Sequence, residues 1–265
     1  MFQTGYCQAA GTGKSHNHDA LFNGAEIKQA KTLTTKIFSP LPDSDGLIRA
    51  AVADGVFNSP NPRLASHFWM QAFAERGRAD AAFLRREFPR FCQTMLPQNH
   101  GSSTTFAAAE ISADGQARIC NVGDSRIYLQ RGGALQRISR DHTKYQEQLD
   151  AGAAAADAAD NPDRHVLTQY LGMLGARQRL MPYFAASVPL AVGDRLLLCT
   201  DGLTGKLSDT QLQSALGTDL PLPELGQSLM AQALAAGPGE QPRADAGVRL
   251  DRGPQRRNPG ARQHP

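Results

Sequence analysis

The sequence lacks any apolar run of membrane-spanning length. A transmembrane helix needs roughly 18 or more consecutive apolar residues, and no such run occurs. The segment from Met1 to Lys14 also lacks the apolar core of a secretory signal peptide. We therefore expect a soluble, cytoplasmic protein that has no membrane partner.

Cysteine is scarce, and no two cysteines lie close together in the sequence. The four cysteines, at positions 7, 92, 120 and 199, form no CxxC motif. Zinc-ribbon and thiol-redox sites are therefore not indicated. Cys120 and Cys199 lie within apolar strand patterns, where cysteine behaves as a small buried hydrophobe. We expect reduced, structural thiols, as is usual in the cytoplasm.

The chain carries little excess charge of either sign. Its formal net charge is +3, from 28 basic and 25 acidic residues, and much of the excess lies in an arginine-rich C-terminal tail. The nearly neutral body gives no indication of a nucleic-acid partner. With 265 residues and 41% hydrophobic content, the chain can form one large domain or two small ones. We favour one domain and expect a monomer.

What the sequence does contain is a recurring pattern in which an apolar segment leads to an aspartate beside a glycine. The segments that show it are Leu196 to Gly202, Ile48 to Gly55 and Ile119 to Asp124. Such aspartates converge if their strands end at the same edge of a sheet, and clustered carboxylates bind hard divalent cations. The alternative is that they are ordinary turn residues of a β-sandwich binding protein. Turn residues, however, need not each follow an apolar strand.

The remaining pattern predicts helices and short strands. Apolar spacings of three and four predict amphipathic helices over residues 63–78 and 81–96, the second containing Pro89, which can kink it. Short alternating segments with glycine turns predict an antiparallel meander between Thr104 and Ile138. A further strand leads to Val188. We therefore predict an α+β fold, a β-sandwich of two antiparallel sheets flanked by helices.

A series of short motifs runs along the chain. In order, the motifs are Asn17-His18-Asp19, Asp54-Gly55, Gly101-Ser102-Ser103-Thr104, Gly123-Asp124-Ser125-Arg126, Asp141-His142, Leu171-Gly172 and Asp201-Gly202-Leu203. Each motif alone is weakly specific, but together and in this order they resemble the protein phosphatase 2C-like family of metal-dependent serine/threonine phosphatases, in its divergent bacterial form. The resemblance covers roughly residues 5 to 236.

The resemblance implies a centre of two metal ions, Mn²⁺ or Mg²⁺, at one end of the sandwich. By position in the motifs, Asp54 would bridge both ions, the Gly55 carbonyl would bind one and Asp201 the other. Asp19 would be a ligand or would orient a metal-bound water. Asp124 stands where the family has a carboxylate near a third, weaker metal site.

The implied activity is hydrolysis of phosphoserine and phosphothreonine on proteins by a metal-bridged water, so the expected partner is a phosphorylated protein in a signalling pathway. Lys14 would bind the phosphate where the family usually has arginine, and a lysine makes a point contact instead of a bidentate one. Two further positions depart from the family pattern. His18 replaces a glutamate, and Phe57-Asn58 replaces a glycine pair.

The C-terminal tail departs most from the family, which ends in an Asp-Asn motif and a final core strand. The tail is rich in Arg, Pro and Gly, so we predict a phosphatase domain over residues 1–238 without its final strand and a disordered tail over 239–265. Asp245 and Asp251 are possible substitutes for the missing metal ligand. A shifted reading frame after about Gly239 is one explanation. A catalytically impaired module that binds a phosphoprotein or a regulatory partner is the alternative function.

Overall fold

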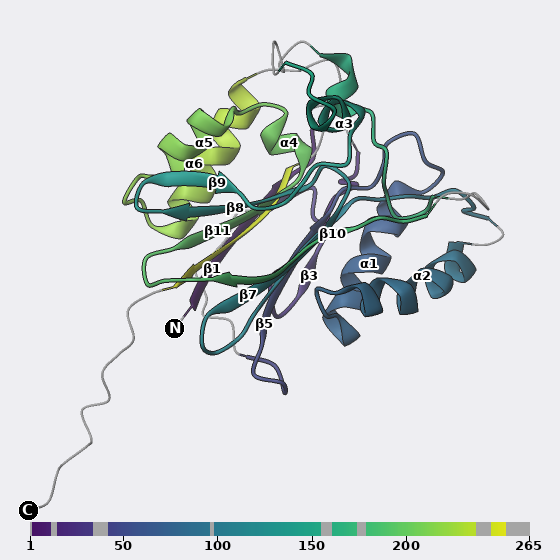
Figure 1. Ribbon diagram of the computed structural model, residues 1–265, viewed down its shortest axis with the longest axis horizontal. Coiled ribbons are helices and arrows are strands. Elements are labelled where there is room, and N and C mark those ends of the chain that lie inside the picture. The colour runs from purple at the N-terminus through teal and green to yellow at the C-terminus, as the bar shows by residue number, and fades with distance from the viewer. Residues whose placement is uncertain are drawn as a thin grey trace, which may run out of the picture.

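The protein forms two antiparallel β-sheets that pack face to face, with helices on both outer faces (Figure 1). This arrangement is seen in a computed structural model that describes residues 2–11, 15–33, 42–95, 98–154, 161–173, 179–236 and 245–252. The predicted α+β sandwich is therefore confirmed. No helix among the described residues is long and apolar enough to cross a membrane.

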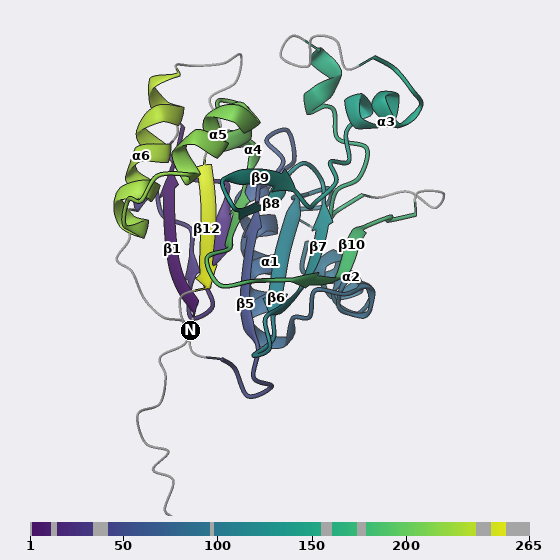
Figure 2. The same cartoon turned by 60° about the vertical axis from the view of Figure 1, so that its left-hand side comes forward.

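One sheet, here called sheet A, contains strands from both ends of the chain. Its spatial order is β4 (Thr32–Leu33), β1 (Phe2–Ala9), β12 (Asp245–Arg252), β11 (Arg195–Cys199), β8 (Arg126–Arg131) and β9 (Ala134–Arg137). Figure 2 shows β1 and β12 running side by side.

The other sheet, sheet B, is built mainly from the first half of the chain. Its spatial order is β10 (Tyr183–Pro189), β7 (Gln116–Val122), β6 (Phe106–Ile111), β5 (Ile48–Ala53), β2 (Ala20–Phe22) and β3 (Ile27–Lys28). The strands predicted between Thr104 and Ile138 therefore form, but not as one meander. β7 lies in sheet B and β8 in sheet A, because the chain crosses between the sheets at Gly123, whose φ is +97°.

The core between the sheets follows from the two-residue period of the strands. In β5, Ile48, Ala50 and Val52 face the other sheet, whereas Ala51 lies on the outer face. In β11, Leu196 and Leu198 face inward in the same way. Strands that are apolar on both faces are expected where each sheet is covered by the other sheet on one side and by helices on the other.

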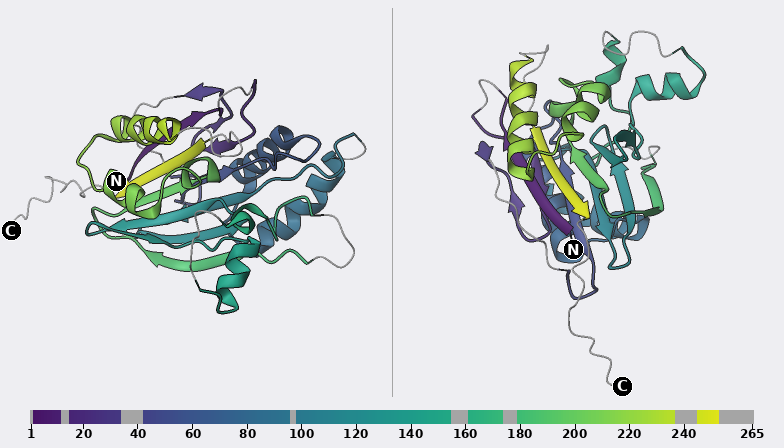
Figure 3. Two further views of the ribbon diagram at one scale, coloured as in Figure 1. Left: turned by 90° about the horizontal axis from the view of Figure 1, so that it is seen from above. Right: turned by 90° about the vertical axis from the view of Figure 1, so that its left-hand side faces the viewer.

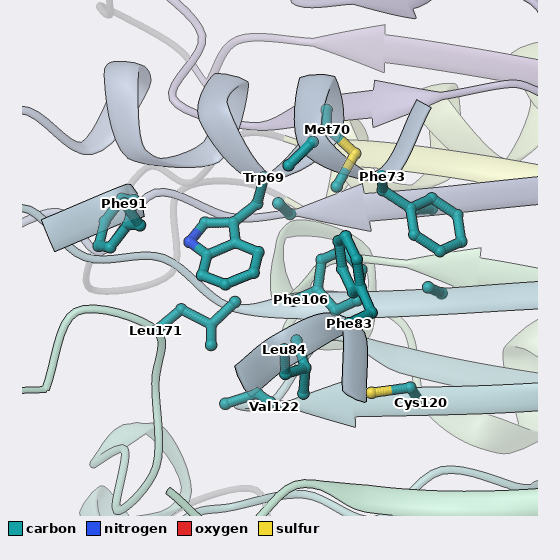
Figure 4. Packing of buried hydrophobic residues seen from close by; sticks show 14 of the residues in the cluster. Trp69, Met70, Phe73, Phe83, Leu84, Phe91, Phe106, Cys120, Val122 and Leu171 are labelled. Atoms are coloured by element: carbon teal, nitrogen blue, oxygen red, sulfur yellow. The ribbon is translucent and has the colours of Figure 1, made fainter. Parts of the chain in front are cut away.

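Helices α1 (Pro62–Arg76) and α2 (Ala81–Met95) cover the outer face of sheet B. Both helices were predicted within two residues of their bounds, and α2 continues through Pro89. Figure 4 shows the aromatic cluster beneath them, with Trp69 between Phe91 and Phe106. The Trp69 side chain is fully buried.

Helices α5 (Asp209–Leu216) and α6 (Leu222–Ala235) cover the outer face of sheet A, on the opposite side of the molecule (Figure 3). Their buried side chains are mostly leucines, which pack against Tyr128, Leu197 and Cys199. The short helix α4 (Asp201–Thr204) links β11 to this layer. None of the four cysteines, all of which the structure describes, forms a disulfide.

Strand β12 corrects the prediction of a wholly unstructured tail lacking the final strand. Residues 245–252 pair with β1 on one side and with β11 on the other. The physical reason is that apolar residues alternate with polar or small ones from Ala246 to Leu250, and two neighbouring strands supply partners for the backbone. The rest of the predicted tail, 239–244 and 253–265, lies outside the described residues.

Helix α3 (Lys144–Asp150) and the 3-10 helix η1 (Pro162–His165) project from one end of the sandwich (Figures 2 and 3). Helix α3 ends at Asp150, and residues 155–160 lie outside the described part of the chain. Backbone hydrogen bonds attach this segment to the body, including one of 2.9 Å from the Thr168 N–H to the His142 carbonyl.

Candidate functional site

A cleft of about 290 Å³ opens where strands of both sheets end. Asp54 follows the last residue of β5 in sheet B, and Asp201 follows β11 in sheet A. Both line the cleft together with Asp124, which lies in the crossing between β7 and β8. The structure thus brings together the three aspartates that the sequence pattern singles out.

The backbone of Asp54 is held by the entrance to β6. The Asp54 N–H donates to Thr105 Oγ1 at 2.9 Å, and the Thr104 hydroxyl donates to the Asp54 carbonyl at 2.7 Å. At the next residue, Gly55, an added Cβ would lie 2.3 Å from the Pro62 carbonyl oxygen. Glycine is therefore required at this turn, which leaves the half-buried Asp54 beside the cleft.

The Asp201 carboxylate lies in a nearly dry environment at the start of α4, where the residue is 5% exposed. Helix N-termini favour negative charge, although a helix this short contributes little. The preceding Thr200 does not cap the helix with its side chain. Its hydroxyl donates instead to Asp19 Oδ2 at 2.7 Å. This hydrogen bond joins the end of β11 in sheet A to the residue before β2 in sheet B.

Asp19, also predicted as a site residue, is 1% exposed. Its backbone N–H donates to Asn17 Oδ1 at 3.0 Å, and its position directly before β2 places it beside Asp54, because Ala20 pairs with Ala53. Asp19 does not line the cleft. Its carboxylate therefore lies behind the cleft and in contact with the strand end that carries Asp201.

Asp124 is positioned by the tight crossing at Gly123. An added Cβ at Gly123 would lie 2.6 Å from Thr105 Cγ2, so no larger residue fits. The neighbouring Ser125 and Thr105 hydroxyls are 2.6 Å apart and share a hydrogen bond. These contacts tie the crossing to the same threonine that holds Asp54, and Asp124 itself is only 6% exposed.

The motif residues Arg126 and Asp141 fix the outer side of this crossing. The Arg126 Nε lies 3.0 Å from each Asp141 carboxylate oxygen, and Nη2 lies 2.6 Å from Oδ2. The next residue, His142, donates its backbone N–H to the Gly123 carbonyl at 3.0 Å. Burial lowers the pKa of His142. Two separated motifs therefore meet and support the loop that carries Asp124.

The sequence pattern missed His165, the last residue of η1. A ring nitrogen of His165 and carboxylate oxygens of Asp124 and Asp201 all lie within 4.8 Å of one another. The imidazole is exposed, whereas both carboxylates are buried. A single histidine in a segment without clear periodicity gave no signal, because only the tertiary arrangement places η1 over the strand ends.

The arrangement fits a divalent metal. Two carboxylates and an imidazole within 4.8 Å of one another form a donor set that suits Mn²⁺ and related ions, whereas oxygen ligands alone favour Mg²⁺ or Ca²⁺. Clustered buried carboxylates repel one another unless a cation or a proton neutralises them. Lys14, the predicted phosphate-binding residue, lies outside the described residues.

The position of β12 distinguishes between the two carboxylates considered as replacement ligands. Asp245 is its first residue, two positions before Gly247, which pairs with Cys199 at the end of β11. The backbone of Asp245 therefore lies at the end of sheet A that carries Asp201. Asp251 pairs with Arg195 at the opposite end of β11.

Comparison with known proteins agrees with this geometry. The protein phosphatase 2C family profile matches residues 41–236. Protein phosphatase PhpP of Streptococcus pneumoniae is 34% identical over 138 residues, 52% of this chain and 54% of that protein. The chain thus spans about half the length of this relative.

Solved structures are similar over nearly their whole length. The Mycobacterium tuberculosis serine/threonine phosphatase PstP/Ppp superposes with a TM-score of 0.75 at 23% identity, covering 96% of this chain and 100% of that one. The PstP catalytic domain in complex with two manganese ions gives a TM-score of 0.68 at 23% identity, covering 95% and 99%. At these identities, the similarity establishes the fold. The family profile matches most of the length of the chain. The chain therefore belongs to the protein phosphatase 2C family.

Proposed function

We propose that this protein is a metal-dependent phosphatase that removes phosphate from phosphoserine and phosphothreonine on proteins. The observation that carries the proposal is the convergence of Asp54, Asp124, Asp201 and His165 on one cleft, in a chain of the protein phosphatase 2C family. A protein substrate suits this cleft, because it is open to the surface beside a second groove instead of enclosed.

Two ions, Mn²⁺ or Mg²⁺, would be held by Asp54, the Gly55 carbonyl and Asp201, with Asp19 behind them. A third, weaker site would use Asp124, Asp201 and His165, whose donor atoms lie within 4.8 Å of one another. The two manganese ions of PstP support this choice of metal. When bound, such ions lower the pKa of water and offset the charge on the transferring phosphoryl group.

The protein's own residues would orient the reactants. Thr104 and Thr105 fix the backbone beside Asp54, and Thr200 fixes the Asp19 carboxylate. Preorganised carboxylates need no rearrangement when charge develops in the transition state. Lys14 remains the proposed phosphate-binding cation, because an ammonium group attracts a phosphate as a point charge.

We propose that Asp245 supplies the C-terminal carboxylate of the site. The support is the backbone register of β12, which begins at the end of sheet A that carries Asp201. The alternative function, an impaired phosphatase-like binding module, rested on the departure at this C-terminal ligand and on Lys14. Because β12 is formed, a carboxylate is available near that position, and the first of these reasons is weakened.

The test is phosphate release by the purified chain from a phosphoserine or phosphothreonine peptide and from p-nitrophenyl phosphate. We expect turnover with Mn²⁺, loss of turnover in EDTA and recovery on re-addition of Mn²⁺. Calorimetry with Mn²⁺ alone tests the metal site without any substrate. Absence of both metal binding and turnover would overturn the proposal.

For the cellular setting, we propose a cytoplasmic monomer that acts in signal transduction by reversing phosphorylation of other proteins, without nucleic-acid or membrane partners. The thiols support a reducing compartment, because the four cysteines form no disulfide. The small net charge of +3 gives no electrostatic reason for nucleic-acid binding.

A further inference from the structure

A second groove, of about 360 Å³, continues from the cleft along the surface. The two share Val56, Asn58, His165 and Leu167 as lining residues. A peptide whose phosphorylated residue occupies the cleft would therefore place its adjoining residues in this groove. The groove is thus a candidate for contacts outside the phosphate itself.

The groove is almost uncharged. Apart from His165, its lining consists of residues without a formal charge, and those not shared with the cleft are Ser59, Pro60, Gly101, Ser103 and Tyr170. Within this lining, no lysine, arginine, aspartate or glutamate is present to pair with a charged residue of a peptide. A charged side chain would lose water here without gaining an ion pair, which is unfavourable.

Two exposed apolar side chains lie at the cleft, next to the groove. Phe57, from the loop before α1, is 58% exposed, and Val166, directly after η1, is 38% exposed. They belong to the small group of large hydrophobic side chains left exposed among the described residues. Their position on two separate segments of one cleft suggests that they are covered when a substrate binds.

The Phe57 ring is supported from behind. It stacks on the His18 ring, with centroids 6.2 Å apart and an interplanar angle of 29°. The His18 carbonyl in turn accepts a hydrogen bond from the Ser66 hydroxyl of α1. A ring held in place loses little conformational entropy on binding. Both His18 and Phe57 stand at positions where the sequence departs from the family pattern. The two unusual side chains contact each other.

We propose that the groove and the Phe57–Val166 pair select substrates with an apolar residue next to the phosphorylated serine or threonine. This inference rests on the proposed phosphatase function and adds the sequence preference of its substrate. An apolar neighbour covers the exposed ring and the valine. An acidic or basic neighbour in the groove meets a lining that, apart from His165, offers no charged partner.

The experiment compares phosphoserine peptides that differ only in the flanking residues, which are Leu, Asp or Lys. With Mn²⁺, we expect kcat/KM for the Leu peptide to exceed those for the Asp and Lys peptides by about tenfold. Equal values for the three peptides would overturn the inference. Hydrolysis of p-nitrophenyl phosphate reports separately on the proposed phosphatase function, because this compound has no flanking residues. If no peptide is hydrolysed, calorimetry measures the Kd of each peptide for the protein. A lower Kd for the Leu peptide supports the preference, and equal Kd values contradict it.

The variant Phe57→Ala tests the ring itself. We expect the Leu-to-Asp ratio of kcat/KM to fall from about ten to below three. The matched control is Leu234→Ala on α6, which removes another apolar side chain that is 52% exposed and lies outside the groove, and it should keep the wild-type ratio. An equal loss for all peptides, with an unchanged ratio, would show that Phe57 only supports the fold and would contradict the proposal.

Discussion

The two helical layers cover their sheets with different side chains. Over sheet B, aromatic rings from α1 and α2 pack on strands rich in alanine, such as Ala51 and Ala108. Over sheet A, α5 and α6 pack leucines against Leu197 and Tyr128. The small alanines of sheet B leave space that the large aromatic rings fill. Over sheet A, leucines of the helices pack against larger strand residues. Much of the packing over sheet B is therefore concentrated in a few rings.

The largest expected effect concerns the two carboxylates that the two sheets contribute to the cleft. We expect Asp54→Asn, from sheet B, and Asp201→Asn, from sheet A, each to lower kcat/KM by at least about 1,000-fold, or roughly 4 kcal/mol. Each change removes charge from the proposed metal centre and keeps the shape of the side chain. The measurement is turnover at saturating Mn²⁺, with the thermal unfolding midpoint as the control for folding.

Retention of half or more of the wild-type turnover by either variant would mean that the substituted carboxylate does not contribute to the centre. The double variant sharpens the comparison. Residues that act as one unit are not additive, so the double variant should be hardly less active than either single one. Additive losses would indicate two independent sites.

The second prediction contrasts the helical layers directly. We expect Trp69→Ala to lower the free energy of unfolding by about 4 kcal/mol and Leu212→Ala by about 3 kcal/mol. Both side chains are fully buried, but the indole leaves the larger cavity. Urea unfolding measures both values. The exposed Leu234→Ala should change stability by less than about 0.5 kcal/mol, and a Leu212 effect larger than that of Trp69 would contradict the comparison.

The third prediction concerns Asp245, the proposed contribution of β12 to the site. We expect Asp245→Asn to lower kcat/KM by about 30-fold, or roughly 2 kcal/mol, because it weakens one proposed metal ligand. Asp251→Asn is the matched control, since Asp251 lies at the other end of the same strand. Similar values for the two variants would remove Asp245 from the proposed centre.

The smallest expected effect is a pH dependence in the layer over sheet B. Burial raises the pKa of Glu87, but hydrogen bonds from Arg86 and the charge of Arg90 outweigh burial and leave the pKa below its ordinary value. The carboxylate therefore stabilises the fold above the unfolded pKa of about 4.3. This contribution is lost as the pH falls through the lowered pKa.

The arginine partners are about half exposed, at 51% and 47%, so solvent screening limits this contribution to about 1 kcal/mol. We expect Glu87→Gln to lose less stability than the wild type between pH 7 and pH 3. Urea unfolding at both pH values measures the difference. The exposed Glu75→Gln, beside Arg76, should behave like the wild type.

Sequence periodicity predicted the layered fold well where the pattern was local. The helices α1 and α2 and the strands β5 and β11 follow from their apolar spacing, and the aspartates that end these strands follow with them. Strand β1 was missed because its polar and small residues become a strand only through pairing with distant neighbours. Strand β12 was missed because its short apolar alternation lies in a tail that is otherwise rich in Arg, Pro and Gly. His165 was missed for a similar reason, since its place over the cleft depends on the tertiary fold.

The order of strands in sheet A has a consequence for the folding of the protein during synthesis. Strand β12 lies between β1 and β11. These two strands are therefore joined into one sheet only after residues 245–252 have been made. Contacts of such large sequence separation form slowly. On a ribosome, sheet B can pair before sheet A is complete. The carboxylates of the cleft, which come from both sheets, would therefore reach their final arrangement only after the last strand has been made.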